Sequence, residues 1–165
     1  MLPVSDDILN MTIKAVHICC FADRSGTNEW GVFLSDLEED TLPVEVDCAI
    51  ENHSNSPRPL LPGGLKAALL FYPNYFTNAE KRWDIKVIPG QTVQDVYDLV
   101  IQGRLDKFEF TSNRAGHRWW IQTFIKLLSD THFFVDKSQV REALQGLRRS
   151  WPGGSDRRIT QGLFY

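Results

Sequence analysis

The sequence has few cysteines and no metal-binding motif. Only three cysteines, Cys19, Cys20 and Cys48, occur among the 165 residues, and two of them are adjacent. An odd number with two neighbours is not typical of a disulfide framework. The patterns CxxC and HExxH, and closely spaced histidines, which commonly bind zinc, are absent as well. The sequence therefore predicts neither a disulfide scaffold nor a metal site.

Long apolar runs and a concentrated charge of one sign are also lacking. No apolar stretch approaches the ~20 residues that span a bilayer, and residues 1–11 lack the basic start and apolar core of a secretory signal. We therefore expect a cytoplasmic protein that does not enter a membrane. The net charge is −3 and the lysines and arginines are scattered, which argues against a nucleic-acid partner. The basic run 148–158, interrupted by Asp156, is typical of a solvated surface, with an anion site as the less favoured alternative.

Aromatic residues are what the sequence has in excess. Five Trp, ten Phe and four Tyr make up 12% of the chain. Large rings fill cores, and they also line apolar ligand pockets, so composition alone does not choose between the two. The length and the 42% of hydrophobic residues fit one globular domain. We predict a single domain over residues 1–165, in which 1–11 could be disordered and 151–165 is a tail that docks on the body.

The first half of the chain is predicted to form β-strands. Apolar and β-branched runs predict five of them, at residues 12–21, 30–34, 44–50, 65–73 and 82–89. In the third of these, Val44, Val46 and Cys48 alternate with Glu45 and Asp47, which indicates one buried and one polar face. Residues 23–29 and 51–64 are rich in turn-forming residues and are expected to be loops.

The second half has helical periodicity. Thr92 is placed as the N-cap of a helix that ends at Gly103, and further helices are expected over 115–128 and from 137 to about Gly146. Residues 107–113 are extended or looped. Strands followed by helices indicate an α+β domain. We predict a largely antiparallel sheet of about five strands, packed against two to three helices.

His117 is the most informative single residue. It precedes Trp120 by three positions and Ile121 by four, so it lies on the buried face of the helix expected from Ala115, in its first turn. The positive end of the helix dipole opposes an imidazolium, which favours a neutral ring able to accept or donate a proton. The alternative is a core histidine with a structural role. Arg118, by itself, could equally be a surface residue.

Four stretches together resemble a family of small fungal proteins with an uncharacterised domain: TNEWGVFL (27–34), VEVDCAI (44–50), AGHRWWIQTFIKLL (115–128) and PGGSDRRITQGLFY (152–165). That domain is in turn similar to a degenerate papain-like or NlpC/P60-like scaffold. In those hydrolases a Cys opens a helix packed on an antiparallel sheet, a strand His is its base, and a polar residue on the next strand orients the His. The resemblance places His117 at the Cys position, Glu29 at the His position, and Asp47, or else Glu45, at the third.

The missing nucleophile suggests chemistry other than hydrolysis. We expect a cofactor-independent cyclase or isomerase of fungal secondary metabolism, acting on an apolar terpenoid or polyketide-like small molecule, with a Diels–Alder-type cyclisation as one form. The predicted catalytic residues are His117, Glu29 and Asp47. The predicted substrate-binding residues are Trp30, Arg118, Trp120 and Glu45. Two alternatives remain open: a non-catalytic module that binds a small molecule or a protein, and a cysteine hydrolase that uses Cys19, Cys20 or Cys48.

Overall fold

The computed structural model describes residues 3–23, 27–51 and 65–165. Its strands are β1 (Ala15–Ala22), β2 (Asn28–Ser35), β3 (Val44–Ile50), β4 (Leu65–Pro73), β5 (Lys81–Lys86), β6 (Phe108–Phe110), β7 (Arg149–Ser150), β8 (Ser155–Asp156) and β9 (Leu163–Phe164). Its helices are α1 (Asp6–Leu9), α2 (Val93–Gln102), α3 (His117–Asp130) and α4 (Lys137–Gly146).

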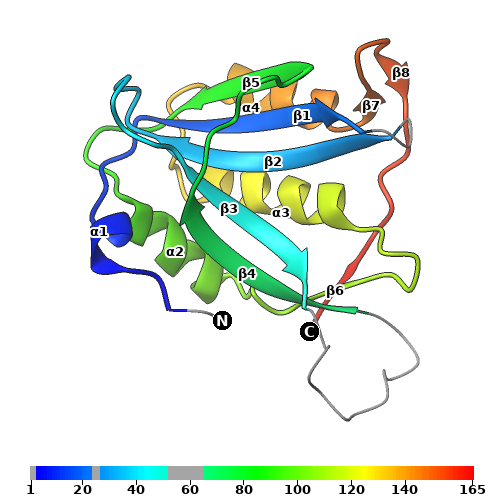
Figure 1. The fold of residues 1–165 in the computed structure, drawn as a ribbon, viewed down its shortest axis with the longest axis horizontal. Coiled ribbons are helices and arrows are strands. Elements are labelled where there is room, and N and C mark those ends of the chain that lie inside the picture. Colours follow the sequence, from blue (N-terminus) through cyan, green and yellow to red (C-terminus); the bar gives the residue numbers. More distant parts are fainter. Residues whose placement is uncertain (1–2, 24–26, 52–64) are drawn as a thin grey trace.

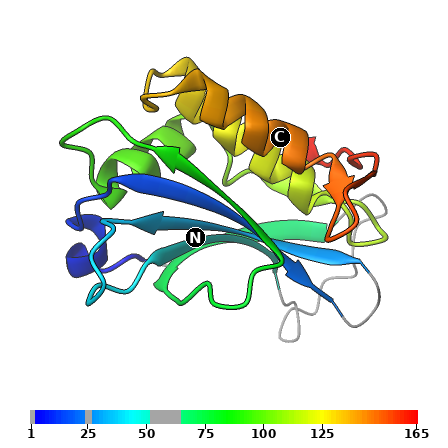
Figure 2. The ribbon, with the colours of Figure 1, turned by 90° about the horizontal axis from the view of Figure 1, so that it is seen from above.

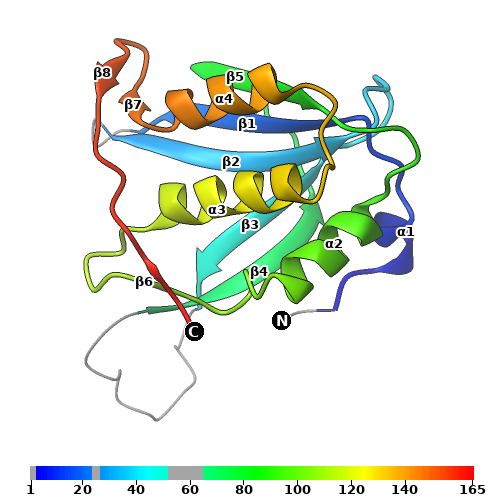
Figure 3. The same ribbon diagram turned by 180° about the vertical axis from the view of Figure 1, so that it is seen from behind.

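One antiparallel sheet organises the fold. Its strand order is β5-β1-β2-β3-β4-β6-β9, so seven strands take part, while β7 and β8 form a separate two-stranded hairpin. Figure 1 shows the sheet from its open face, and Figure 3 shows α2, α3 and α4 across the opposite face. Seen from above, α3 (yellow) and α4 (orange) form a second layer over the sheet (Figure 2). The α+β class and the antiparallel sheet that the sequence predicted are thus confirmed.

The sheet is wider than predicted, with seven strands in place of about five. The two additional strands are β6, in the segment expected to be extended or looped, and β9, in the tail expected to dock. Both are only two or three residues long, and such short segments carry no readable alternation. They are strands because the sheet supplies a partner: β6 pairs with β4, and β9 pairs with β6.

The N-terminal segment also differs from the expectation of disorder. Residues 6–9 form α1, a helix in addition to the two or three that were predicted, and it packs against α2 and β4. Ile8 and Leu9 are partly buried against the core. Val4 and Met11, on either side of the helix, are partly buried against the core as well. The predicted loop over 51–64 lies outside the described residues apart from Glu51, as do residues 24–26 of the first predicted loop.

The core lies between the sheet and the helices. Val32 and Leu34 of β2 stand opposite Val46 and Val44 of β3, and all four side chains are buried. Helix α3 contributes five fully buried side chains to the same core: Trp120, Ile121, Phe124, Ile125 and Leu128. Removing apolar surface from water gives roughly 25 cal/mol per Å², so this contact is the main force that holds α3 against the sheet.

Strands β2 and β3 separate at one end. Their described pairing covers three positions on each strand, 32–34 with 44–46, although both strands continue beyond them. Residues 28–31 of β2 pair with β1, and residues 47–50 of β3 pair with β4. Figure 1 shows the two strands diverging toward the side where the β7–β8 hairpin lies. The sheet is therefore open between β2 and β3 above the first turn of α3.

Candidate functional site

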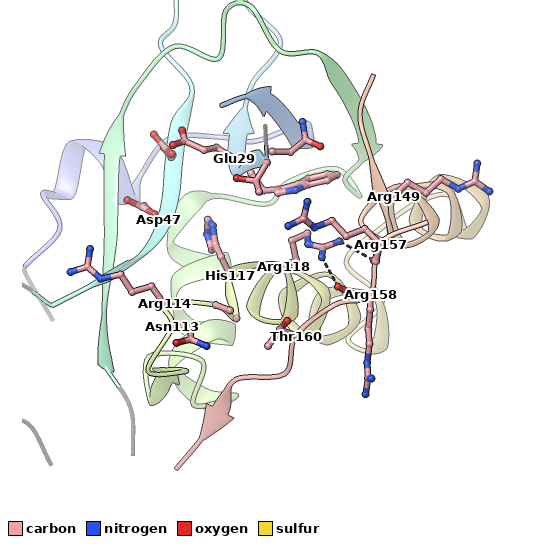
Figure 4. A pocket seen from close by; sticks show the side chains of 16 residues that line it. Glu29, Asp47, Asn113, Arg114, His117, Arg118, Arg149, Arg157, Arg158 and Thr160 are labelled. Atoms are coloured by element: carbon pink, nitrogen blue, oxygen red, sulfur yellow. Dashed lines mark hydrogen bonds between the residues drawn. The ribbon is translucent and has the colours of Figure 1, made fainter. Parts of the chain in front are cut away.

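A cavity of about 850 Å³ lies at this opening. Its walls come from β2, β3, the loop before α3, the first turn of α3 and the tail (Figure 4). The lining residues are Thr27, Asn28, Glu29, Trp30, Glu45, Asp47, Asn113, Arg114, Ala115, Gly116, His117, Arg118, Arg149, Arg157, Arg158 and Thr160. The volume is within the range of sites that bind small molecules.

Six of the seven side chains that the sequence predicted for a site line this one cavity. Strand β2 supplies Glu29 and Trp30, β3 supplies Glu45 and Asp47, and α3 supplies His117 and Arg118. Figure 4 shows the His117 ring directed into the space that Glu29 and Asp47 also line.

Trp120 was predicted to bind substrate, and the structure places it elsewhere. Its side chain is fully buried, it stacks on Phe124 with ring centroids 5.4 Å apart, and its Nε1 donates a 2.9 Å hydrogen bond to the carbonyl of Leu105. One helical turn separates Trp120 from His117, and over that distance α3 passes from the cavity to beneath the sheet. Trp120 is a core residue and does not line the cavity.

The start of α3 positions His117. Gly116 precedes it with φ 131°, a backbone conformation that side chains with a Cβ rarely adopt. A Cβ at Gly116 would also lie 3.2 Å from the Phe108 ring. No side chain caps the helix at this N-terminus. The glycine therefore lets the chain turn tightly into α3, so that His117 is the first helical residue and is half-buried at the cavity.

Burial shifts the proton affinities of two groups in opposite directions. It lowers the pKa of His117 to about 4, because the imidazolium is poorly solvated there. The pKa of Asp47 is raised, first by burial and then by the charge of Glu45. His117 is therefore neutral near pH 7, and the two groups are closer in proton affinity than an ordinary His and Asp. Such matching is what proton transfer between side chains requires.

A hydrogen-bonded group holds the carboxylates of β3. Tyr72 stands opposite Glu45 in the β3–β4 register, close enough for its hydroxyl to interact with the carboxylates of Glu45 and Asp47. Asn74 Nδ2 donates to Glu45 Oε2 at 2.6 Å. Burial and these acceptors raise the pKa of Tyr72. Neither Tyr72 nor Asn74 was predicted, although antiparallel pairing of the predicted strands 44–50 and 65–73 would have brought Tyr72 near Glu45.

Arg118 lines the cavity as predicted and also holds the C-terminal tail. Its Nη1 donates to the carbonyls of Leu147 at 2.6 Å and Arg157 at 3.2 Å, and its Nη2 donates to the carbonyl of Arg158 at 2.7 Å (Figure 4). These bonds join α3 to the end of α4 and to the tail. Three of its five N–H groups donate to backbone carbonyls, so we assign to Arg118 a role in holding the tail.

Asn28 fixes the tail from the other side. Its Nδ2 donates to the Trp151 carbonyl at 2.9 Å, and its Oδ1 accepts from the Trp151 N–H at 2.8 Å. The Asn28 side chain thus binds the N–H and the carbonyl of Trp151, as the backbone of a neighbouring strand would. Trp151 lies 123 positions further along the chain than Asn28. Arg118 and Asn28 together place the segment from Trp151 to Arg158 along the rim of the cavity. Sequence reasoning missed Asn28, because nothing local marks so distant a pair.

The cavity is charged, which corrects the expectation of an apolar, aromatic-lined pocket. Among the described residues that line it, Trp30 is the one Trp, Phe or Tyr, and most of the other large rings are packed in the core. Five arginines and three carboxylates line it instead. The excess of aromatic residues was a signal of core packing. Residues 148–158, expected to be solvated surface, bring Arg149, Arg157 and Arg158 to the site.

The three cysteines do not line the cavity. Cys19, Cys20 and Cys48 are free and buried, and their pKa values are raised by burial, to about 12 for Cys19 and Cys20. A buried thiol that stays protonated is a poor nucleophile. This placement gives no support to the cysteine-hydrolase alternative.

Acid should destabilise the fold through His117 and His17. The pKa values of His117 and His17 are both lowered, mainly by burial, the latter despite a 2.6 Å contact of its Nδ1 with Asp84. The unfolded chain then binds more protons below pH 6.5, so the free energy of unfolding falls as pH decreases. The raised pKa of Asp47 acts in the opposite sense. We expect a net fall of about 2 kcal/mol between pH 6.5 and 4, less than the full shift of His117 because its side chain contacts water.

Urea unfolding at several pH values would measure this loss. The variant His117→Asn should show a shallower dependence, because asparagine does not titrate. An unchanged slope in the variant would mean that the acid sensitivity comes from other groups.

No helix in the described part of the chain is long and apolar enough to cross a membrane. Among the same residues, no three His, Cys, Asp or Glu side chains converge closely enough to hold a metal ion.

Comparison with known proteins places the chain in a family. No curated protein and no solved structure matches it. The sequence model of one family matches residues 15–165, which include every strand and three of the four helices described above. The chain therefore belongs to the family described as a domain of unknown function, DUF7770.

Proposed function

We propose that the cavity catalyses an isomerisation or cyclisation that needs no cofactor, with His117 as the group that moves the proton. The observation that carries this proposal is the pairing of a neutral, half-buried His117 with a carboxylate of raised pKa, Asp47, on the walls of one cavity. Carboxylate and imidazole groups of shifted pKa, placed together in a concave site, are typical of general acid–base catalysis.

The proposed reaction is a proton transfer within one substrate molecule. The neutral His117 takes a proton from a carbon next to a carbonyl, and the electron pair of that C–H bond moves toward the carbonyl oxygen. The proton is then returned at another atom, so that the product has the mass of the substrate and no oxidant or reductant takes part. Glu29, on β2, lines the same cavity and can orient the polar end of the substrate.

A pericyclic cyclisation would use the same site differently. His117 would donate a hydrogen bond to a substrate carbonyl, which lowers the barrier by withdrawing electron density. One well-placed donor in a site shielded from water contributes about 2.7–4 kcal/mol of transition-state stabilisation. Holding a flexible chain in a folded conformation contributes further through orientation. The scaffold resemblance supports both forms, because it places His117 at a reacting position. A role in fungal secondary metabolism rests on that resemblance as well.

A non-catalytic small-molecule-binding module is the second candidate. The observation that favours it is the number of arginines around the cavity, which is more than proton transfer requires. Binding without conversion would then be the whole function.

A conversion experiment separates the two. Purified protein is incubated with a metabolite extract of the source organism, and the mixture is followed by chromatography with mass spectrometry. The proposal expects one metabolite to be consumed into an isomer of equal mass, at a rate that falls as pH is lowered toward 4, where His117 becomes protonated. Retention of a metabolite on the protein without any change would favour the binding module. A product of different mass would contradict the isomerase.

A further inference from the structure

We propose that the ligand of this cavity is a small organic anion, and that its phosphate or carboxylate group binds to Arg157, whose side chain reaches over the cavity, while Arg149 and Arg158 add positive charge at the rim on the tail side (Figure 4). This inference uses the same cavity as the proposed function and names the class of its substrate, but it does not depend on catalysis. The remainder of the molecule would extend toward the carboxylates and His117 on the strand side.

The first argument is the concentration of positive charge. Five of the 18 lysines and arginines line this one cavity, in a chain whose net charge is −3. They come from three separate stretches: the loop before α3, the first turn of α3, and the segment from β7 to the tail. A locally basic, solvated run would not bring arginines from distant parts of the sequence to one concave surface.

The second argument is the way the tail arginines are held. Arg118 binds the backbone carbonyls of Arg157 and Arg158, and Arg149 pairs with Asp156 in the β7–β8 hairpin register. The backbone at these positions is thereby fixed at the rim while the guanidinium groups stay exposed. Side chains that start from a fixed backbone lose less entropy on binding a ligand than side chains on a free tail.

The third argument is that this charge is not compensated within the described part of the chain. No carboxylate there lies within 4 Å of the guanidinium nitrogens of Arg149, Arg157 or Arg158, although other lysines and arginines do form such pairs. The carbonyls of Leu147, Arg157 and Arg158 accept hydrogen bonds from Arg118 without neutralising its charge. Its pKa is lowered by burial and by the charge of Arg157. A bound anion would relieve this repulsion.

The opposite wall limits the size of the anion. Glu29, Glu45 and Asp47 would repel a polyanion laid across the cavity, which argues against nucleic acid. A molecule with its anionic group at one end can bind the arginines on the tail side without placing negative charge next to the carboxylates on the strand side. Arginine forks bind phosphate and carboxylate equally well in geometry, with two parallel N–H···O bonds each. We therefore predict a ligand with an anionic group that an arginine can bind in this way, either a phosphate or a carboxylate.

The test is a calorimetric titration with inorganic phosphate and, separately, with succinate, at constant ionic strength kept with chloride. We expect saturable binding of at least one probe to the wild-type protein. The double variant Arg157→Gln/Arg158→Gln should weaken it at least tenfold, and its backbone carbonyls can still accept from Arg118. The control Arg141→Gln removes an exposed arginine of α4 outside the cavity and should leave binding unchanged.

Each outcome has a distinct meaning. Tighter binding of phosphate than of succinate identifies a phosphorylated ligand, and the reverse identifies a carboxylic acid. Absence of binding by both probes, or equal weakening in the double variant and the control, overturns the inference. Anion binding without any isomer formation would refute the proposed function alone, whereas isomer formation without anion binding would refute this inference alone.

Discussion

Replacing His117 by asparagine is expected to lower the rate of the conversion by about 10²–10⁴-fold while the fold persists. Asparagine is polar and similar in size, so it can occupy the first position of α3 at the cavity. It has no group that accepts and releases a proton near neutral pH. A loss of turnover with little change in KM would show that His117 acts in the chemical step, because a lost binding contact would raise KM instead.

The matched control is His132→Asn. His132 is exposed, lies after α3 outside the cavity, and has φ 58°, a conformation that asparagine adopts readily. Steady-state kinetics of both variants, with circular dichroism to check the fold, would show whether His117 acts in the chemical step. If His117→Asn keeps a rate within threefold of the wild type, His117 moves no proton, and an amide donor that serves equally well would favour the pericyclic form.

Replacing Arg118 by glutamine is expected to lower the free energy of unfolding by about 3 kcal/mol. Three hydrogen bonds from a charged donor are lost, and each is worth about 1.5–3 kcal/mol when well protected. We take less than the sum because Arg118 is half exposed to the cavity, and glutamine can restore one bond. The carbonyls of Leu147, Arg157 and Arg158 would lose this shared donor.

The effect should be local as well as global. Amide hydrogen exchange of residues 157–165 should become much faster in Arg118→Gln, because the tail loses its bond to α3. Arg148→Gln is the control, since Arg148 is exposed and lies next to Leu147, but its side chain takes no part in the hydrogen bonds of Arg118. Arg118→Lys should recover part of the stability, because an ammonium group reaches fewer carbonyls at once. If urea unfolding of Arg118→Gln matches that of the control, the tail is held by its apolar contacts alone.

The sequence carries most of the fold because its long elements have clear periodicity. Thr92 and Gly103 bound α2 as predicted, with a complete capping box at Thr92. The alternation of Val44, Val46 and Cys48 with Glu45 and Asp47 matches the observed burial of β3. The short strands β6 and β9 could not be found, because two or three residues adopt strand geometry only when a neighbouring strand is present.

The residues of the site also differ in whether the sequence could predict them. His117, Glu29 and Asp47 could be placed together because each lies at a readable position, one at a helix start and two on strands. Trp120 was misassigned because helical spacing does not tell where the helix passes from the cavity to the core. The arginines of 149–158 and the role of Arg118 were beyond prediction, since they depend on hydrogen bonds between residues 29 to 123 positions apart.

The chain carries its own optical probe. The Trp30 and Trp83 rings stack with centroids 5.7 Å apart, and Trp151 meets Trp83 edge-on at 5.5 Å. Trp30 lines the cavity, Trp83 packs under Gly146 at the end of α4, and Trp151 begins the tail. Indoles at this distance couple electronically and give near-ultraviolet circular dichroism that disappears when fixed packing is lost. A single unlabelled spectrum should therefore follow ligand entry and tail release together.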